Sequence, residues 1–104
     1  MKVMFEGRYS AEAWAGVNES AKARMAATTQ LAESVGGTME AMYWCPGDEY
    51  DFVLIVSGID AQGVMAIKKV VGATGALVET RARVLLDADE FDAAQPGTYA
   101  APNK

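Results

Sequence analysis

Residues 47–56, Gly-Asp-Glu-Tyr-Asp-Phe-Val-Leu-Ile-Val, join a polar segment to an unbroken apolar run. Glycine and aspartate in the first half favour a tight turn. The five apolar residues that follow are of the kinds that favour strands. A run without polar interruption is typical of a strand that is buried on both faces. The stretch therefore predicts a hairpin turn that leads into a central strand.

Three further segments alternate apolar and polar residues with the period of two that is typical of strands: 3–9, 38–45 and 76–86. Residues 11–35 and about 60–72 instead carry apolar residues three and four apart, which predicts two helices. The resulting order is β-α-β-β-α-β. Because each crossover is right-handed, both helices lie on one face of a four-stranded sheet. The sequence thus predicts an α+β fold, the ferredoxin-like plait, with its first and third strands central.

Local signals mark the helix ends. Ser10 and Asp60 are suited to cap the two predicted main helices, because their side chains can accept from free backbone amides. Asp87 and Glu90 have the spacing of a capping box, which predicts a short third helix through about Ala94.

Length and composition limit the classes of function. A chain of 104 residues suits one domain, which we expect over residues 1–92, with a loosely ordered tail over 93–104. The net charge of −5 disfavours nucleic acid as a partner. No apolar stretch has the length of a membrane span, and the start lacks a secretory-signal pattern, so no membrane association is expected. The single cysteine, Cys45, adds to the expectation of a cytoplasmic protein.

The chain contains no histidine, which removes the commonest general base and the commonest metal ligand. One cysteine cannot build a zinc or haem site by itself. The glycines form neither a phosphate loop nor a dinucleotide fingerprint. We therefore expect no metal and no cofactor.

One face of the predicted sheet carries no helix, and two sets of side chains are predicted to share it. The apolar set is Met4, Met42, Trp44, Val53, Ile55, Leu77 and Leu85. The charged set is Glu6, Arg8, Glu79, Arg81 and Arg83. Such an apolar patch is a liability on a monomer, so we expect a homodimer with an interface that includes Met42, Trp44, Val53, Ile55, Arg81 and Arg83. The alternative is a solvated face whose opposite charges pair across strands.

Several short pieces follow one another in an order that resembles a known family. They are Tyr9-Ser10-Ala11-Glu12, Arg24, Leu31-Ala32-Glu33-Ser34-Val35-Gly36-Gly37, Glu49-Tyr50-Asp51, Gly72-Ala73-Thr74-Gly75 and Leu85-Leu86-Asp87-Ala88-Asp89-Glu90-Phe91-Asp92. This series, over nearly the whole chain, resembles the GYD domain family, which is named for a Gly-x-Tyr-Asp signature before the third strand. Here Asp48 stands at the position of the signature glycine and Gly47 comes one residue earlier, which predicts an altered turn. The family is similar to dimeric α+β barrel proteins, which implies two sheets packed face to face. The resemblance implies no defined activity.

Three residues are candidates for chemistry. Tyr50 and Asp51, at the entrance of the third strand, could orient and deprotonate a small substrate. Alternatively, Asp51 accepts hydrogen bonds from turn amides while Tyr50 packs. Arg24 lies beside the apolar stripe of its helix, so it could reach a pocket between helix and sheet or extend over the surface. Such a pocket could be lined by Tyr9, Trp14 and Tyr43, which could equally belong to the core.

Three functions remain open on this basis. The first is a homodimeric barrel that binds a small organic molecule. The second is a cofactor-independent enzyme, monooxygenase- or isomerase-like, with Tyr50, Asp51 and Arg24 near the chemistry. The third is an oligomerisation module. A closed pocket that contains both Arg24 and Tyr50 would favour the enzyme, and a filled interior would favour the module.

Overall fold

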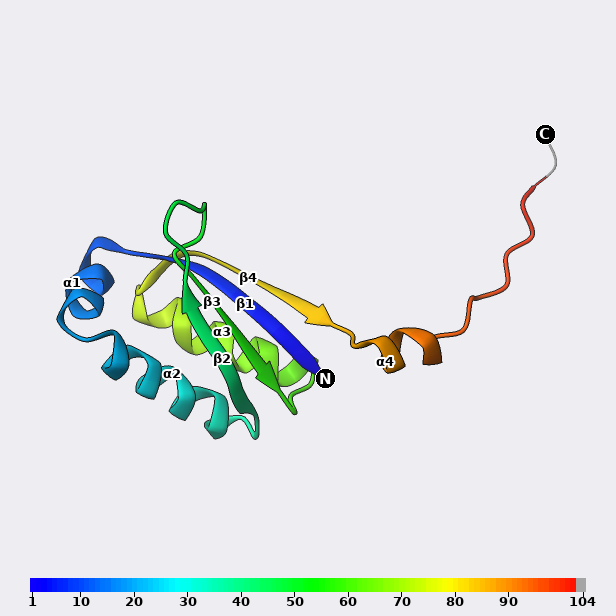
Figure 1. Ribbon diagram of the computed structural model, residues 1–104, viewed down its shortest axis with the longest axis horizontal. Coiled ribbons are helices and arrows are strands. Elements are labelled where there is room, and N and C mark those ends of the chain that lie inside the picture. The colour runs from blue at the N-terminus through cyan, green and yellow to red at the C-terminus, as the bar shows by residue number, and fades with distance from the viewer. Residues whose placement is uncertain (103–104) are drawn as a thin grey trace.

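The computed structural model of the protein describes residues 1–102. One antiparallel sheet has the strand order β2-β3-β1-β4 (Figure 1). Its strands are β1 (Lys2–Tyr9), β2 (Thr38–Trp44), β3 (Phe52–Ser57) and β4 (Leu77–Leu85). The prediction of a four-stranded sheet with the first and third strands central is confirmed, and the strand order agrees with the ferredoxin-like plait.

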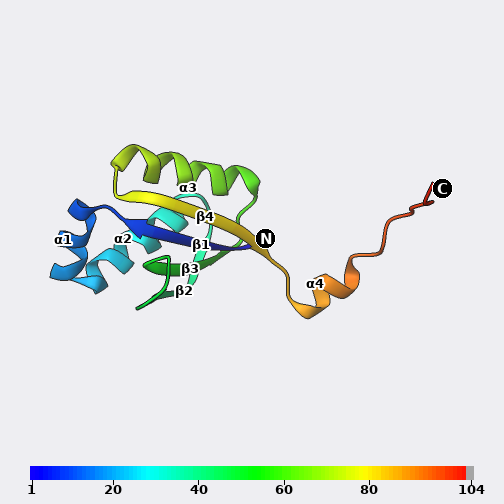
Figure 2. The same cartoon turned by 90° about the horizontal axis from the view of Figure 1, so that it is seen from above.

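The helices are α1 (Ala11–Glu19), α2 (Ala21–Ser34), α3 (Ala61–Thr74) and α4 (Ala88–Ala93). Side chains of α2 and α3 meet those of β1 and β3 on the same side of the sheet, which we call the helix side. Figure 2 shows α3 lying along the sheet, whereas α4 follows beyond the end of β4. The opposite side of the sheet is the helix-free face.

The single long helix predicted over residues 11–35 is wrong. The backbone at Ser20 is extended, with φ −160° and ψ 107°, and this separates α1 from α2. The Ser20 hydroxyl accepts a hydrogen bond from the amide of Ala23 at 3.1 Å. Serine is a favoured N-cap because its short side chain reaches such free amides. An apolar stripe cannot show this break, because the spacing continues across it.

The other predicted helix starts are confirmed. Ser10 accepts from the amide of Ala13 at 3.2 Å, and Asp60 accepts from the amide of Gly63 at 2.8 Å. At α4, the side chains of Asp87 and Glu90 each bond to the backbone of the other residue, which completes the capping box.

A bulge in β2 changes which of its side chains share a face. The register with β3 shifts between Met39 and Ala41. Beyond the shift, Met42 faces Leu54 and Trp44 faces Phe52, so both lie on the helix side. The predicted position of Met42 and Trp44 on the helix-free face is therefore wrong, because one extra residue moves every later side chain to the other face.

A second register shift has the same effect at the start of β4. It occurs in the pairing with β1, between Arg8 and Tyr9, and leaves Leu77 opposite Tyr9. Leu77 therefore lies on the helix side, and its predicted place on the helix-free face is also wrong. The rest of β4 follows the prediction, with Glu79, Arg81, Arg83 and Leu85 on the helix-free face.

The core lies between the sheet and the helices. Its most buried large side chains are Val3 and Val56, each 1% exposed. The long apolar stripe contributes less than predicted: α2 fully buries only Ala32, while Trp14 and Met25 are 37% and 40% exposed. The inward face of α2 instead lines a cavity.

The region after β4 projects away from the sheet (Figure 1). The radius of gyration is 16.9 Å, which exceeds the roughly 13 Å of a compact chain of this length. Residues 95–102 form no helix or strand. The end of the predicted tail, residues 103–104, lies outside the described residues. None of the helices within residues 1–102 combines the length and the apolar character that a membrane crossing requires.

Candidate functional site

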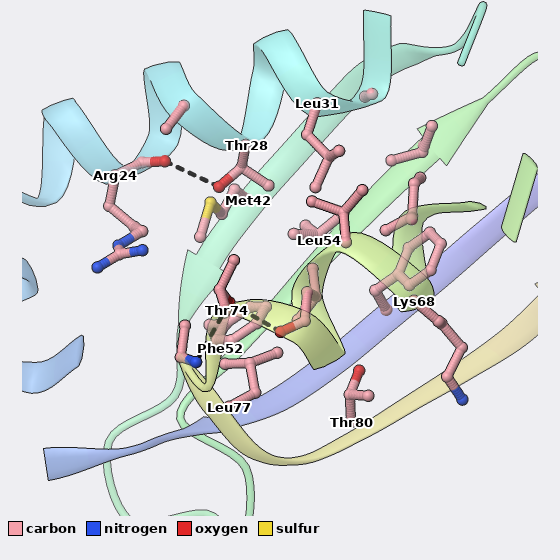
Figure 3. A pocket seen from close by; sticks show the side chains of 18 of the residues that line it. Arg24, Thr28, Leu31, Met42, Phe52, Leu54, Lys68, Thr74, Leu77 and Thr80 are labelled. Carbon is pink, nitrogen blue, oxygen red and sulfur yellow. Dashed lines mark hydrogen bonds between the residues drawn. The ribbon is translucent and has the colours of Figure 1, made fainter. Parts of the chain in front are cut away.

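A cavity of about 290 Å³ lies between α2, α3 and the helix side of the sheet (Figure 3). Its wall is mainly apolar and includes Leu31, Met42, Phe52, Leu54, Ile67 and Val71. Packed protein interiors contain few voids larger than a water molecule. The volume is close to the lower end of the range for ligand pockets, roughly 300–1,000 Å³. This cavity is therefore the principal candidate for a small-molecule site.

The cavity wall carries two cations, Arg24 and Lys68, which lie at its opposite ends in Figure 3. Three threonine hydroxyls also line it, and each donates its only proton to a backbone carbonyl. Thr28 bonds to the carbonyl one turn back, Thr74 bonds within its own helix, and Thr80 bonds across to β1. These hydroxyls can therefore only accept from a ligand.

Tyr9 lines the cavity and also contacts neighbouring aromatic side chains. Its ring stacks on Phe52 with centroids 5.0 Å apart and meets Trp14 edge-on at 5.1 Å. Its hydroxyl accepts a hydrogen bond from Trp44 Nε1 at 3.1 Å, and the Arg24 Cζ lies 5.8 Å from its ring centroid. Burial raises the pKa of the Tyr9 phenol above its usual value, and the bond from Trp44 opposes this rise. The phenol is thus neutral at physiological pH.

Of the three aromatic candidates, only Tyr9 lines the cavity together with Arg24. Trp14 instead borders a second hollow that also touches Trp44 and Cys45. Tyr43 is 65% exposed on the helix-free face. Lys68 was not among the predicted site residues, although it carries the signal that identified Arg24: a cation placed beside a predicted apolar stripe.

Tyr50 lies on the other side of the sheet from Arg24. It is 4% exposed, and its hydroxyl donates to Glu79 Oε1 at 2.9 Å. The same hydroxyl accepts from Arg81 Nη1 at 3.4 Å, and the guanidinium lies 5.3 Å from the ring centroid. The hydrogen bond with Tyr50 raises the pKa of Arg81. Tyr50 thus belongs to a polar network on the helix-free face, and the structure does not bring it to Arg24.

Two ion pairs extend this network. Arg8 Nη2 lies 2.6 Å from Glu79 Oε2, and Arg83 pairs with Glu6, which is 6% exposed. Within residues 1–102, the buried Nε of Arg8 has no hydrogen-bond partner. The same residues contain no group of three or more acidic or cysteine side chains that could hold a metal ion. We use the name charged network for Tyr50 together with five charged residues: Glu6, Arg8, Glu79, Arg81 and Arg83.

Asp51 is engaged with the backbone. Its Oδ2 accepts from the amide of Tyr9 at 2.9 Å, beside the register shift of β1, and its own amide donates to the carbonyl of Gly7 at 2.9 Å. In the turn before it, Gly47 has φ 81°, a conformation that side-chain-bearing residues avoid. The displaced glycine therefore still supplies a left-handed residue to the turn.

Comparison with known proteins identifies the family. The family model of the GYD domain matches residues 4–94. A search of curated proteins gave no match, and a search of solved structures gave none either. Because the matched range runs from β1 through α4 and covers most of the chain, this protein belongs to the GYD domain family.

Proposed function

We propose that this protein binds a small, largely apolar organic molecule in the cavity between α2, α3 and the sheet. The cavity itself is the observation that supports the proposal, because its volume of about 290 Å³ and its mainly apolar wall suit such a ligand. A ligand with an apolar body covers this apolar wall, and the removal of apolar surface from water is favourable. The cations at the two ends supply polar anchors.

The other two hypotheses have less support. The enzyme hypothesis requires Tyr50, Asp51 and Arg24 at one place, whereas Tyr50 and Arg24 lie on opposite sides of the sheet. The carboxylate of Asp51 is already bonded to a backbone amide. A filled interior would favour the oligomerisation module, and the cavity leaves the interior incompletely filled. Ligand binding is the function that this geometry supports best.

We also propose that the protein is a cytoplasmic homodimer in which two helix-free faces pack together as an α+β barrel. Four partly buried apolar side chains support this interface: Met4, Val53, Ile55 and Leu85. A two-fold interface must be complementary to itself. The charged network meets this condition, since it carries both signs, and Arg81 and Arg83 stay in the proposed interface. Light scattering at micromolar concentration tests the assembly, and a mass of one chain would contradict it.

A large side chain placed in the cavity tests the binding proposal. Thr28 lines the cavity, while the next residue, Thr29, does not. Each hydroxyl donates to the carbonyl one turn back at 2.8 Å, so Thr28→Trp and Thr29→Trp each lose one equivalent hydrogen bond. The thermal midpoints of the wild type and both variants are measured with indole, benzoate, octanoate and octanol.

We expect at least one compound to raise the midpoint of the wild type and of Thr29→Trp, because a ligand stabilises the state that binds it. Thr28→Trp should show no such rise, since the indole occupies the site. The proposal is wrong if no compound stabilises the wild type, or if Thr28→Trp responds as Thr29→Trp does.

A further inference from the structure

If the cavity binds a small molecule as proposed above, the charges on its wall indicate the charge of that ligand. The charged lining residues are Arg24 and Lys68, both cations, although the chain as a whole has a net charge of −5. The ion pairs within residues 1–102 are Arg8–Glu79 and Arg83–Glu6, so neither cation has an acidic partner there. Positive charge on an apolar cavity wall that itself carries no carboxylate favours an anionic ligand over a neutral one.

At its end of the cavity, the Arg24 guanidinium lies near Gly16 and the Tyr9 ring. A Cβ atom on Gly16 of α1 would lie 3.3 Å from Arg24 Nη2, tighter than most such contacts, so the absence of a side chain makes room for this group. On another side, the Tyr9 ring lies within the range of a cation–π contact, at 5.8 Å. The guanidinium therefore lies close to two neighbouring elements, α1 and β1.

Tyr9 lines the same cavity, and its hydroxyl carries a second donor. Its oxygen accepts from the Trp44 indole, while its proton has no acceptor within the part of the chain that the structure describes. The residue is 6% exposed. A phenol hydroxyl can donate one hydrogen bond while its oxygen accepts another, so this proton is available to a ligand. Because burial raises the pKa of Tyr9, the proton is present throughout the physiological range.

We propose that the ligand is a monocarboxylic acid with an apolar body, bound as the carboxylate by the Arg24 guanidinium and the Tyr9 hydroxyl. Guanidinium groups suit carboxylates because their parallel N–H donors match the two oxygens. The apolar body lies against Phe52, Leu54 and Ile67 in the middle of the cavity. Lys68 stands at the far end and is not part of the carboxylate site (Figure 3).

A matched pair of ligands tests this assignment. Octanoate and octanol share the same chain and differ in the charged group, so the ratio of their dissociation constants, measured by calorimetry, isolates the contribution of the carboxylate. We expect the wild type to bind octanoate at least about tenfold more tightly, a difference of about 1.4 kcal/mol. Arg24→Met should abolish the preference and retain octanol binding. Tyr9→Phe, which keeps the ring, should reduce the preference severalfold.

Two further variants serve as controls. Lys22→Met removes an exposed cation of the same helix that does not line the cavity, and it should leave the preference unchanged. Lys68→Met removes the cation at the far end and should also leave most of the preference. If Lys68→Met abolishes the preference and Arg24→Met does not, the assignment to Arg24 is wrong.

The outcomes separate this inference from the binding proposal. Equal affinity of the wild type for octanoate and octanol, blocked in both cases by Thr28→Trp, would overturn the carboxylate assignment and leave cavity binding standing. No binding of either compound by the wild type would overturn the carboxylate assignment, and a failure of the whole ligand panel would overturn cavity binding as well.

Discussion

The apolar side chains of one strand, β3, are buried to different extents on the two faces of the sheet. On the helix side, Phe52, Leu54 and Val56 of β3 are at most 6% exposed and line the cavity. On the helix-free face, the intervening Val53 and Ile55 are only partly buried. All five residues are equally suited to a core by their chemistry. The layer that covers each face, and not the apolar character of the strand, sets how deeply each side chain is buried.

The charged groups on the two faces differ in whether they have a partner of opposite charge. On the helix-free face, Glu6 and Glu79 each have an arginine partner. On the helix side, Arg24 and Lys68 border an apolar cavity without an acidic partner in residues 1–102. Satisfied charges stabilise or align a surface, whereas unbalanced charges beside a cavity are available to a ligand. This contrast locates the proposed binding site on the helix side and the proposed interface on the other.

Aspartate at two adjacent positions of β3 should separate the two faces most strongly. Leu54→Asp places a charge in the core and should lower the free energy of unfolding by about 3–5 kcal/mol or more, enough to unfold most of the chain. Ile55→Asp should retain a cooperative melt and the circular dichroism of the wild type while reducing the mass in solution to one chain. A dimer that persists in Ile55→Asp would show that the helix-free face is not the interface.

The two ion pairs of the charged network should differ in value because their burial differs. Arg83→Ala leaves the buried carboxylate of Glu6 without its partner and should cost about 1–3 kcal/mol in denaturant melts. Arg8→Ala breaks a pair whose side chains are 43% and 39% exposed, and should cost about 0–1 kcal/mol. Unchanged thermal midpoint and dimer affinity in Arg83→Ala would mean that the network consists of ordinary solvated pairs.

The carboxylate of Asp51 accepts a hydrogen bond from the Tyr9 amide. Variants of Asp51 test whether this bond to the backbone is the residue's contribution to stability. Asp51→Ala leaves that amide without an acceptor and should lose about 1–2 kcal/mol. Asp51→Asn keeps an oxygen at the same place and should lose less in the same urea melts. Equal losses in both variants would indicate that the negative charge matters, rather than the hydrogen bond.

The smallest expected effect concerns the pH dependence of stability at Tyr9. Its folded-state pKa is raised by burial above the unfolded value of about 10. The phenol is neutral in both states below that value, so stability is fully present there. As pH rises from the unfolded pKa through the folded one, the unfolded chain releases the proton first and stability is lost.

Urea midpoints at about pH 9 and about pH 11 measure this loss, since the two conditions lie on either side of the unfolded value. The midpoint should fall less between them in Tyr9→Phe than in the wild type. Tyr43→Phe, which alters an exposed phenol of the helix-free face, is the matched control. An equal fall in the wild type and Tyr9→Phe would contradict the buried position of the phenol.

Much of the fold followed from local patterns, while the lining of the candidate site was predicted only in part. The apolar run after Tyr50 identified a central strand, and the capping residues identified three helix starts, because these signals act within a few residues. The break at Ser20 carried a local signal, a favoured N-cap residue, that the continuous apolar stripe concealed. For the site, Arg24 and Tyr9 were identified as candidates, but their separation from Tyr50 was not.

The sequence by itself determined the four strands, their order along the chain and three of the four helix starts, because propensity, capping and periodicity are properties of neighbouring residues. Tertiary structure alone decided the two register shifts, which moved Met42, Trp44 and Leu77 to the helix side. It also decided the distance at which α2 stands from the sheet, and with it the cavity. Register and the separation of layers depend on contacts between residues far apart in the chain, and no local pattern records those contacts.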